Sequence, residues 1–285
     1  MLGQEYMRNA LLAGGFIALA CGVCGWFVVL RGQLFAGDAL SHVAFPGALA
    51  AAAAGIDERI GLFAATITAA VGIALLGRGA LAGRGSRAAG AALADDADIG
   101  VLFAFVLAVG LYFLTRFSLG SGGSAGVQAS RTLFGSIFGL GAGEAQFAAI
   151  VAALVLVAMA AIARPLLFAS VAPALAGARG VPTRLLSIGF MAILGVVAAE
   201  ATQAVGALLL LGLLAGPAGA AQQLRVPSAA GALLASALAL AAMWGGLVLA
   251  YLVPSLPPST SVIGLCTLAY LGAVAVRRGA GGAHR

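Results

Sequence analysis

The sequence predicts an all-α, polytopic membrane protein built as a helix bundle. Of its 285 residues, 62% are hydrophobic and only 8% are charged, whereas about a quarter of the residues in a soluble domain are charged. Apolar segments of about 20 residues, the length a helix needs to cross a bilayer, follow one another along the chain. The 42 glycines suit the close helix–helix approach that is found in lipid. We therefore expect about eight to nine transmembrane helices.

The apolar segments are interrupted by short polar or glycine-rich connections. They lie at about residues 9–30, 36–55, 59–77, 98–115, 144–163, 184–203, 205–223, 229–251 and 260–276. Gly37 and Pro46 are expected to break the second segment, and Gly216-Pro217 the seventh, because proline removes the bond to the carbonyl four residues back. In the second segment the released carbonyl is that of His42, which is tolerated at membrane depth if it lines a cavity or an interface. For the seventh, a simple packing kink is an equal alternative.

No soluble domain of normal size fits between these segments. We therefore expect residues 1–285 to form a single transmembrane domain with a membrane core at 9–277. The first segment is longer than the core of a signal peptide and has no clean cleavage site, so it is predicted to be a retained helix.

The arginines predict the orientation of the chain. All 15 basic residues are arginine. If the N-terminus is outside, most of them fall in inside loops, as the positive-inside rule expects. The outside arginines would be Arg8, Arg59, Arg116 and Arg131. Nine spans then place the C-terminus inside; eight or ten spans are the alternatives if one weak segment is re-entrant or split.

The complete absence of lysine excludes a Walker A loop, whose lysine contacts the nucleotide phosphates. Any ATP-driven work therefore requires a separate subunit. The net charge of +6 does not indicate nucleic-acid binding, because the arginines are scattered over short loops.

Three connections are long enough to interpret. Residues 78–97 contain Asp95 and Asp96 at their end, and Asp98 follows directly. We expect these carboxylates to cap the following helix rather than bind a metal. The apolar stretch 132–140 is too short to span, so it is predicted to be a re-entrant or interfacial half-helix. Residues 164–183 are predicted to form a cytoplasmic connection that contains a short helix.

The three cysteines, Cys21, Cys24 and Cys266, all lie in apolar segments. The Cys21-x-x-Cys24 spacing is also that of a redox or soft-metal pair. No basic residue stands near it to stabilise a thiolate, so we favour simple packing.

Ionisable side chains at membrane depth are the main functional signal. With the other charges in loops, these are Asp38, His42 and Glu200. Asp38 and His42 are four residues apart and share one helix face, where carboxylate and imidazole suit Zn²⁺ or Mn²⁺. Two ligands are too few for a closed site, but a two-fold homodimer would supply two of each. A polar pair that locks two helices together is the alternative. Glu200 either reaches water at the outer interface or attracts a cation.

Four stretches give the chain a strong resemblance to a known family of membrane permeases. They are Gly37-Asp38-Ala39-Leu40-Ser41-His42-Val43-Ala44-Phe45-Pro46-Gly47, then 98–103, 133–137 and 205–218. The first is specific, and the others are mostly apolar. In order and spacing they are similar to the ABC-3 permeases of ATP-binding-cassette (ABC) manganese/zinc importers over about residues 9–275.

That resemblance implies a type II ABC importer-like fold and a dimeric permease, homodimeric or built from two paralogues, in the cytoplasmic membrane of a prokaryote. Two cytoplasmic ATPase subunits and an extracytoplasmic metal-binding protein would be its partners. Asp38 and His42 correspond to the family's metal-coordinating pair. The segment 172–182 resembles the ATPase-coupling helix, with Ala172 and Ala174 where the family often has acidic residues. The coupling residues expected are Pro173, Leu175, Arg179, Gly180 and Pro182.

The function that follows is a permease subunit without its own ATPase site, which carries Mn²⁺ or Zn²⁺, with Fe²⁺ as a third candidate. The metal would be the substrate, and no permanently bound cofactor is expected. The alternatives are a proton-coupled metal carrier that works without an ATPase, and an importer of a metal chelate. The coupling-like segment argues against the carrier, and the Asp38/His42 pair against the chelate.

Overall fold

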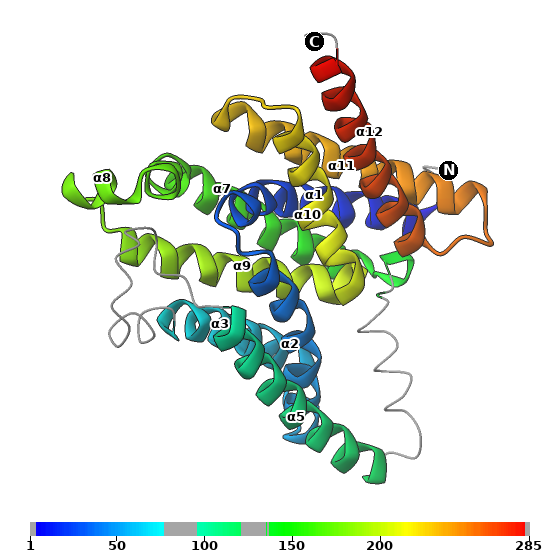
Figure 1. The fold of residues 1–285 in the computed structure, drawn as a ribbon. Helices are drawn as coiled ribbons and strands as arrows, with labels where there is room; N and C mark the ends of the chain where they lie inside the picture. Colours follow the sequence, from blue (N-terminus) through cyan, green and yellow to red (C-terminus); the bar gives the residue numbers. More distant parts are fainter. Residues whose placement is uncertain (1–3, 77–95, 121–134, 136, 283–285) are drawn as a thin grey trace. The chain divides into compact units, whose positions relative to one another are not determined.

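The computed structural model describes residues 4–76, 96–120, 135 and 137–282. In these residues the regular secondary structure is helical, as predicted (Figure 1). The elements are α1 (Glu5–Leu30), α2 (Leu34–Ala53), α3 (Glu58–Leu76), α5 (Asp96–Gly120), η1 (Ile137–Gly139), α7 (Ala142–Val171), α8 (Pro173–Ala178), α9 (Thr183–Val205), α10 (Ala207–Gln223), α11 (Ser228–Leu252) and α12 (Pro258–Gly282).

Each predicted apolar segment corresponds to one helix. Within the described ranges, eight helices are long and apolar enough to cross a membrane. The ninth apolar helix, α10, is shorter, with 17 residues. The described residues group into two compact units, one comprising 1–34, 134–156 and 200–285 and the other 35–133 and 157–199.

In the first unit, glycines let α1 and α11 approach closely in antiparallel directions. A Cβ on Gly15 would lie 2.9 Å from Nε1 of Trp244, and one on Gly22 would lie 2.4 Å from Cα of Ser236. Trp244 Nε1 also donates a hydrogen bond to the carbonyl of Leu11 at 3.1 Å. Small residues are the usual helix contacts in lipid, where backbones can then come together.

Helices α10 and α12 of the same unit run in parallel. Gly212 faces Ile263 at one level, and Gly219 faces Tyr270 two turns further along both helices. Arg277 near the end of α12 donates a hydrogen bond to Gln223 at the end of α10. Arg225 follows α10 at this same end. The parallel direction of α10 and α12, and the arginines at their shared end, agree with the predicted topology, in which these two spans both end on the inside.

In the second unit, α2 packs against α3 through two facing glycines. A Cβ on Gly47 would lie 2.6 Å from the carbonyl oxygen of Gly61, and one on Gly61 would lie 2.4 Å from that of Gly47. Next to this contact, small and apolar side chains form a buried cluster of Ala44, Ala48, Leu62 and Ala199. Helix α2 is thereby held between α3 and the end of α9.

The breaks expected at Pro46 and Pro217 are wrong, because both helices run through the proline, whereas a packing kink at Pro217, the alternative, is compatible with a continuous helix. Helix α2 is continuous across Pro46, and α10 is continuous across Pro217. One proline removes a single main-chain hydrogen bond, and both rings are buried in the chain, so packing offsets the loss.

The structure also differs from the half-helix predicted at 132–140. Its described part forms only the single 3₁₀ turn Ile137–Gly139, and the rest lies outside the described residues. The acidic cap is confirmed in part: α5 begins at Asp96, and Asp96 and Asp98 lie in its first turn. Asp95 falls outside the described residues.

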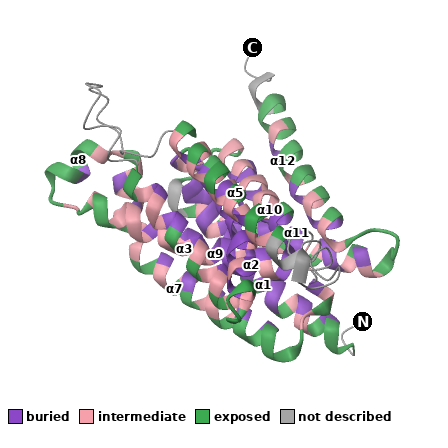
Figure 2. Ribbon diagram, turned by 90° about the horizontal axis from the view of Figure 1, so that it is seen from below, coloured by how far each residue is buried: buried purple, intermediate pink, exposed green. Residues whose placement is uncertain are grey.

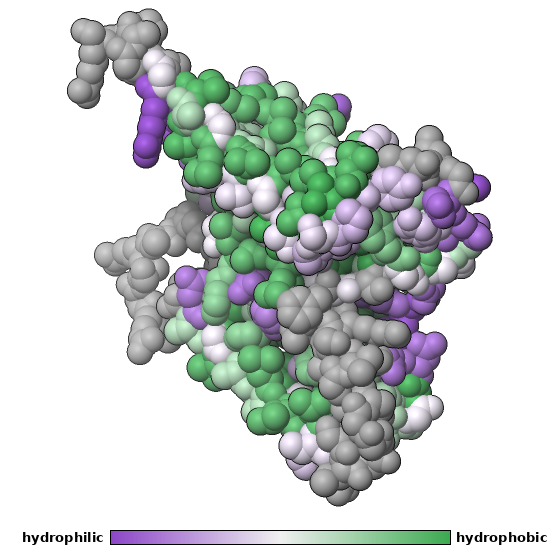
Figure 3. Space-filling model, turned by 90° about the vertical axis from the view of Figure 1, so that its right-hand side faces the viewer, coloured by the Kyte–Doolittle hydropathy of each residue, from purple (hydrophilic) through white to green (hydrophobic). Residues whose placement is uncertain are grey.

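Burial follows the helix contacts and leaves a hydrophobic exterior. Buried residues lie along the helix sides that meet neighbours, while much of α5 and α12 is exposed (Figure 2). The face in Figure 3 is largely hydrophobic. Large apolar side chains such as Val101 and Leu233 are each 73% exposed, which fits contact with lipid chains.

Candidate functional site

A tight turn sets where α2 begins and therefore where its polar residues lie. Gly32 has a φ of +68°, and Gln33 N–H donates to the carbonyl of Val28 at 2.8 Å, which closes the end of α1. Arg31 Nε donates to Gln33 Oε1 at 3.1 Å. Burial lowers the pKa of the Arg31 guanidinium, but its ordinary pKa is so high that it stays charged.

Asp38 and His42 occupy the same side of α2, as their spacing predicts. Asp38 is one helical turn, about 6 Å, from the start of the helix. Their side chains are 34% and 27% exposed, whereas Ala39 and Leu40 between them are buried. The helix thus turns its apolar residues into the unit and leaves these two polar groups on an open side.

The two functional groups lie close without bonding each other. His42 Nε2 is 3.9 Å from Asp38 Oδ1, which is too long for a hydrogen bond. The ligands of a divalent metal lie about 2.0–2.2 Å from it, so two ligands of one ion are about 3–4 Å apart. The observed separation therefore suits an ion held between the carboxylate and the imidazole.

Ser41, which lies between them in sequence, does not join the pair. Its side chain is fully buried, and its hydroxyl donates to the main-chain carbonyl of Asp38 at 2.6 Å. The hydroxyl is used within the helix and offers no ligand on the open side.

Helix α5 covers one side of the pair, a relationship that spacing within α2 does not reveal. The ring of Phe103 lies 5.7 Å from the imidazole of His42, centroid to centroid, at an interplanar angle of 47°. One turn beyond His42, Pro46 rests on Gly110. Because Pro46 has no N–H, the carbonyl of His42 lacks its helical partner here.

Glu200 belongs to the first unit and is only 5% exposed. One of its two interpretations expected the side chain to reach water, and this burial contradicts that interpretation. Among the described residues, no group of three or more His, Cys, Asp or Glu side chains could hold a metal ion. Cys21, Cys24 and Cys266 are free and buried, in keeping with packing. Asp38 and His42 therefore remain the two candidate metal ligands in one chain.

The predicted short helix in the 164–183 connection is present as α8. It ends in a Schellman motif: Gly180 has a φ of +77°, and Val181 N–H donates to the carbonyl of Ala176 at 3.0 Å. Ala176 is fully buried, while Leu175 is 50% exposed. The guanidinium of Arg179 lies 5.9 Å from the ring centre of Phe168. Pro182 precedes α9 and is exposed.

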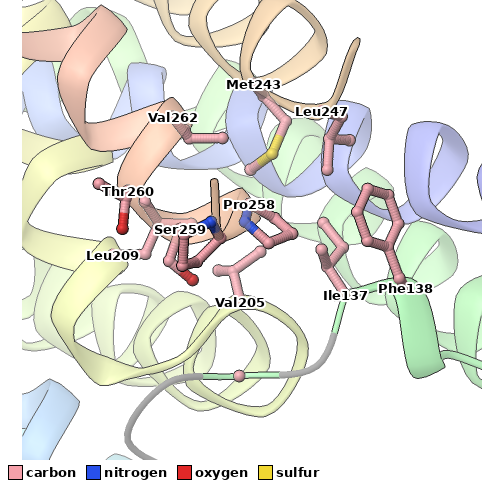
Figure 4. A pocket seen from close by; sticks show the side chains of 12 residues that line it. Ile137, Phe138, Val205, Leu209, Met243, Leu247, Pro258, Ser259, Thr260 and Val262 are labelled. Atoms are coloured by element: carbon pink, nitrogen blue, oxygen red, sulfur yellow. The ribbon is translucent and has the colours of Figure 1, made fainter. Parts of the chain in front are cut away.

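A separate cavity of about 530 Å³ lies in the first unit between η1 and the facing ends of α9, α10, α11 and α12 (Figure 4). Apolar side chains such as Ile137, Met243 and Val262 line it, and its polar side chains are the hydroxyls of Ser259 and Thr260. With no carboxylate, imidazole or thiolate in its lining, this cavity is unsuited to a divalent metal.

Comparison with known proteins decides the family. A sequence model of the ABC 3 transport family matches residues 3–277. The chain belongs to this family. It is therefore a multi-pass membrane permease of an ABC transport system and not the ATPase, as the sequence predicted.

Similar proteins cover most of the chain. The manganese transport system membrane protein MntC of Halalkalibacterium halodurans is 29% identical over 217 residues, which is 76% of this chain and 69% of MntC. The manganese import system permease protein ScaB of Streptococcus gordonii is 28% identical over 247 residues, 87% of this chain and 83% of ScaB. A probable iron transport system membrane protein of Haemophilus influenzae is 26% identical over 213 residues, 75% and 72% of the two chains.

The fold is similar to a solved structure of PsaBC from Streptococcus pneumoniae in complex with Fab. The TM-score is 0.78 at 24% identity, over 95% of this chain and 91% of the other. The predicted type of helical fold is thereby confirmed.

Proposed function

We propose that this ABC 3 family permease imports a divalent transition metal, with Mn²⁺ and Fe²⁺ as the leading substrates and Zn²⁺ as the third. The observation that carries the proposal is the 3.9 Å separation of Asp38 Oδ1 and His42 Nε2 on an open side of α2. An oxygen and an imidazole nitrogen suit Mn²⁺, Fe²⁺ and Zn²⁺, whereas Cu⁺ prefers sulfur. The relatives named for manganese and iron support the first two.

A site with only two ligands per chain suits the transport of a metal ion better than its storage. An ion on a transport path must bind well enough to enter and weakly enough to leave. Two copies of the permease, related by a two-fold axis, would bring two carboxylates and two imidazoles to one ion. The carbonyl of His42, which has no N–H of residue 46 to accept from, would add an oxygen ligand from each copy. We propose Glu200 only as a weaker candidate, since it lies in the other unit.

Energy for import would come from partner subunits. The chain has no lysine and therefore no Walker A loop. We propose that two cytoplasmic ATPase subunits bind at α8 and its ends, with Leu175 as the apolar contact and Arg179 as the charged one. Leu175 is half exposed, whereas Ala176 on the same helix is fully buried. Leu175 is therefore available for an apolar contact with a partner subunit. The residues Pro173, Gly180 and Pro182 would shape this segment. An extracytoplasmic metal-binding protein would deliver the ion from the other side.

The test is radiometal uptake into vesicles that contain the complete transporter, with and without the ATPase subunits. We expect ATP-dependent uptake that competing Mn²⁺ or Fe²⁺ inhibits, and a large loss in Asp38→Ala and His42→Ala. Ser41→Ala is the matched control, because its buried hydroxyl donates to the carbonyl of Asp38 in its own helix and lies away from the open side. Wild-type uptake in both ligand variants would contradict the metal site.

Two other functions are outcomes of the same experiment. Uptake that persists without any ATPase would identify a proton-coupled carrier. Inhibition only by a metal chelate, with no effect of the free ion, would identify a chelate importer. Apart from two hydroxyls, the side chains that line the 530 Å³ cavity are apolar. The cavity therefore offers little that could recognise a charged chelate.

A further inference from the structure

The motif at residues 98–103 has no role in the metal site proposed above, yet it lies beside it. In the second unit, α5 runs along α2 in the same direction, with three contacts at successive levels. Gly100 faces Phe35, Phe103 faces His42, and Gly110 faces Pro46. Phe103 is thus the α5 side chain at the level of the candidate metal ligand.

The imidazole of His42 has few polar or aromatic partners. Within the described part of the chain, these are Asp38, at 3.9 Å, and the ring of Phe103. It makes no hydrogen bond among those residues. A metal-binding histidine usually has its second ring nitrogen held by a hydrogen bond, which fixes the orientation of the ring. For His42, the contact with the ring of Phe103 takes the place of such a hydrogen bond.

The geometry of the contact suits this role. Aromatic pairs are favourable at centroid distances of about 4.5–7 Å in tilted or edge-on arrangements. The observed 5.7 Å and 47° fall in this range and leave His42 Nε2 on the side of Asp38. An unsupported imidazole would lose rotational freedom on binding an ion, and that loss would weaken binding.

We propose that Phe103 is a positioning residue of the metal path, which holds the imidazole of His42 ready to bind the ion together with Asp38. This proposal rests on the proposed function of Asp38 and His42. It predicts that removing the ring affects the apparent affinity for the metal more than the maximal rate, because the ligands themselves remain.

The experiment is concentration-dependent radiomanganese uptake by the complete transporter. We expect Phe103→Leu to raise the apparent KM about two- to tenfold, with the maximal rate little changed. Phe103→Tyr keeps the ring and should stay near wild type. Phe105→Leu is the matched control on the same helix, because Phe105 is 66% exposed and the aromatic partner of His42 is Phe103. If Phe103→Leu does not reach the membrane, Phe103→Met, which fills the volume without a ring, replaces it.

An unchanged KM in Phe103→Leu, or a lower maximal rate at unchanged KM, would overturn the positioning role. The failure of the proposed metal site is distinguishable in the same assay. If Asp38→Ala and His42→Ala transport normally, the metal site itself is wrong. If they lose uptake while Phe103→Leu behaves as wild type, the site stands and only the role of Phe103 is refuted.

Discussion

Pro46 of α2 lies directly on Gly110 of α5, and a Cβ on residue 110 would be only 2.6 Å from Cγ and 2.9 Å from Cβ of the proline. The proline ring is rigid and cannot rotate away from such an intrusion. The contact joins α5 to α2 one turn beyond His42. The proline that offers no N–H to the His42 carbonyl is therefore also part of a helix–helix contact.

We expect Gly110→Ala to destabilise the protein by about 1–3 kcal/mol, the usual cost of overpacking a tight contact. The measurement is thermal unfolding of the purified protein in detergent. Gly189→Ala is the control, because a Cβ on this helical glycine meets nothing within 4 Å. Equal melting temperatures for the two variants would show that α5 moves away from α2 at little cost.

A second prediction concerns Gly25 in α1, which lies against the backbone of α10. A Cβ there would be 2.2 Å from the carbonyl oxygen of Leu214 and 3.0 Å from its Cα. Backbone atoms cannot rotate aside, so we expect Gly25→Ala to reduce the amount of folded protein in the membrane strongly. Fluorescence-detected size-exclusion chromatography measures this amount. Gly264→Ala on α12, where a Cβ would meet nothing within 4 Å, should give a normal folded peak.

A third prediction uses two glycines of the connection between α7 and α9. Gly180 has a φ of +77°, where an L-residue costs about 1–2 kcal/mol, while Gly177 lies inside α8. Neither meets an obstacle within 4 Å, so the comparison isolates backbone conformation. We expect Gly180→Ala to lower the uptake driven by ATP, since the end of α8 would shift, and Gly177→Ala to leave it unchanged. The reverse order would show that the Schellman motif does not matter for coupling.

The sequence predicted the helices well and the contacts between them poorly. Hydropathy located every long helix, because burial in lipid requires an uninterrupted apolar segment. The predicted ends lie within about six residues of the observed ones, except that α7 continues to Val171, beyond the predicted end at 163. The pair Asp38 and His42 was found because both residues are on one helix, where spacing determines the shared side. Phe103 beside His42, and Gly110 under Pro46, could not be found in this way. Such contacts depend on how two helices pack, which no spacing within either helix encodes.

The proline expectations failed for the same reason. A proline in an isolated helix favours a break, but at Pro46 a neighbouring helix with a glycine at the right level accommodates the ring. Glu200 illustrates a second error, in the expected exposure of a side chain. Its position near a helix end suggested water, whereas its burial depends on neighbours that lie elsewhere in the sequence.

The last prediction tests the proposed docking of the ATPase at α8. Leu175 is 50% exposed, and Ala174 beside it is also exposed. If Leu175 inserts into a partner pocket, Leu175→Ser removes apolar area that is buried only in the complex, which corresponds to about tenfold weaker binding. Co-purification of the ATPase with tagged permease, followed by titration in detergent, measures this loss. Ala174→Ser adds a hydroxyl on the same helix and should bind normally, and the thermal stability of the permease alone should be the same for both variants. Undiminished ATPase binding by Leu175→Ser would mean that the contact is carried elsewhere on the connection, with Arg179 as the next residue to test.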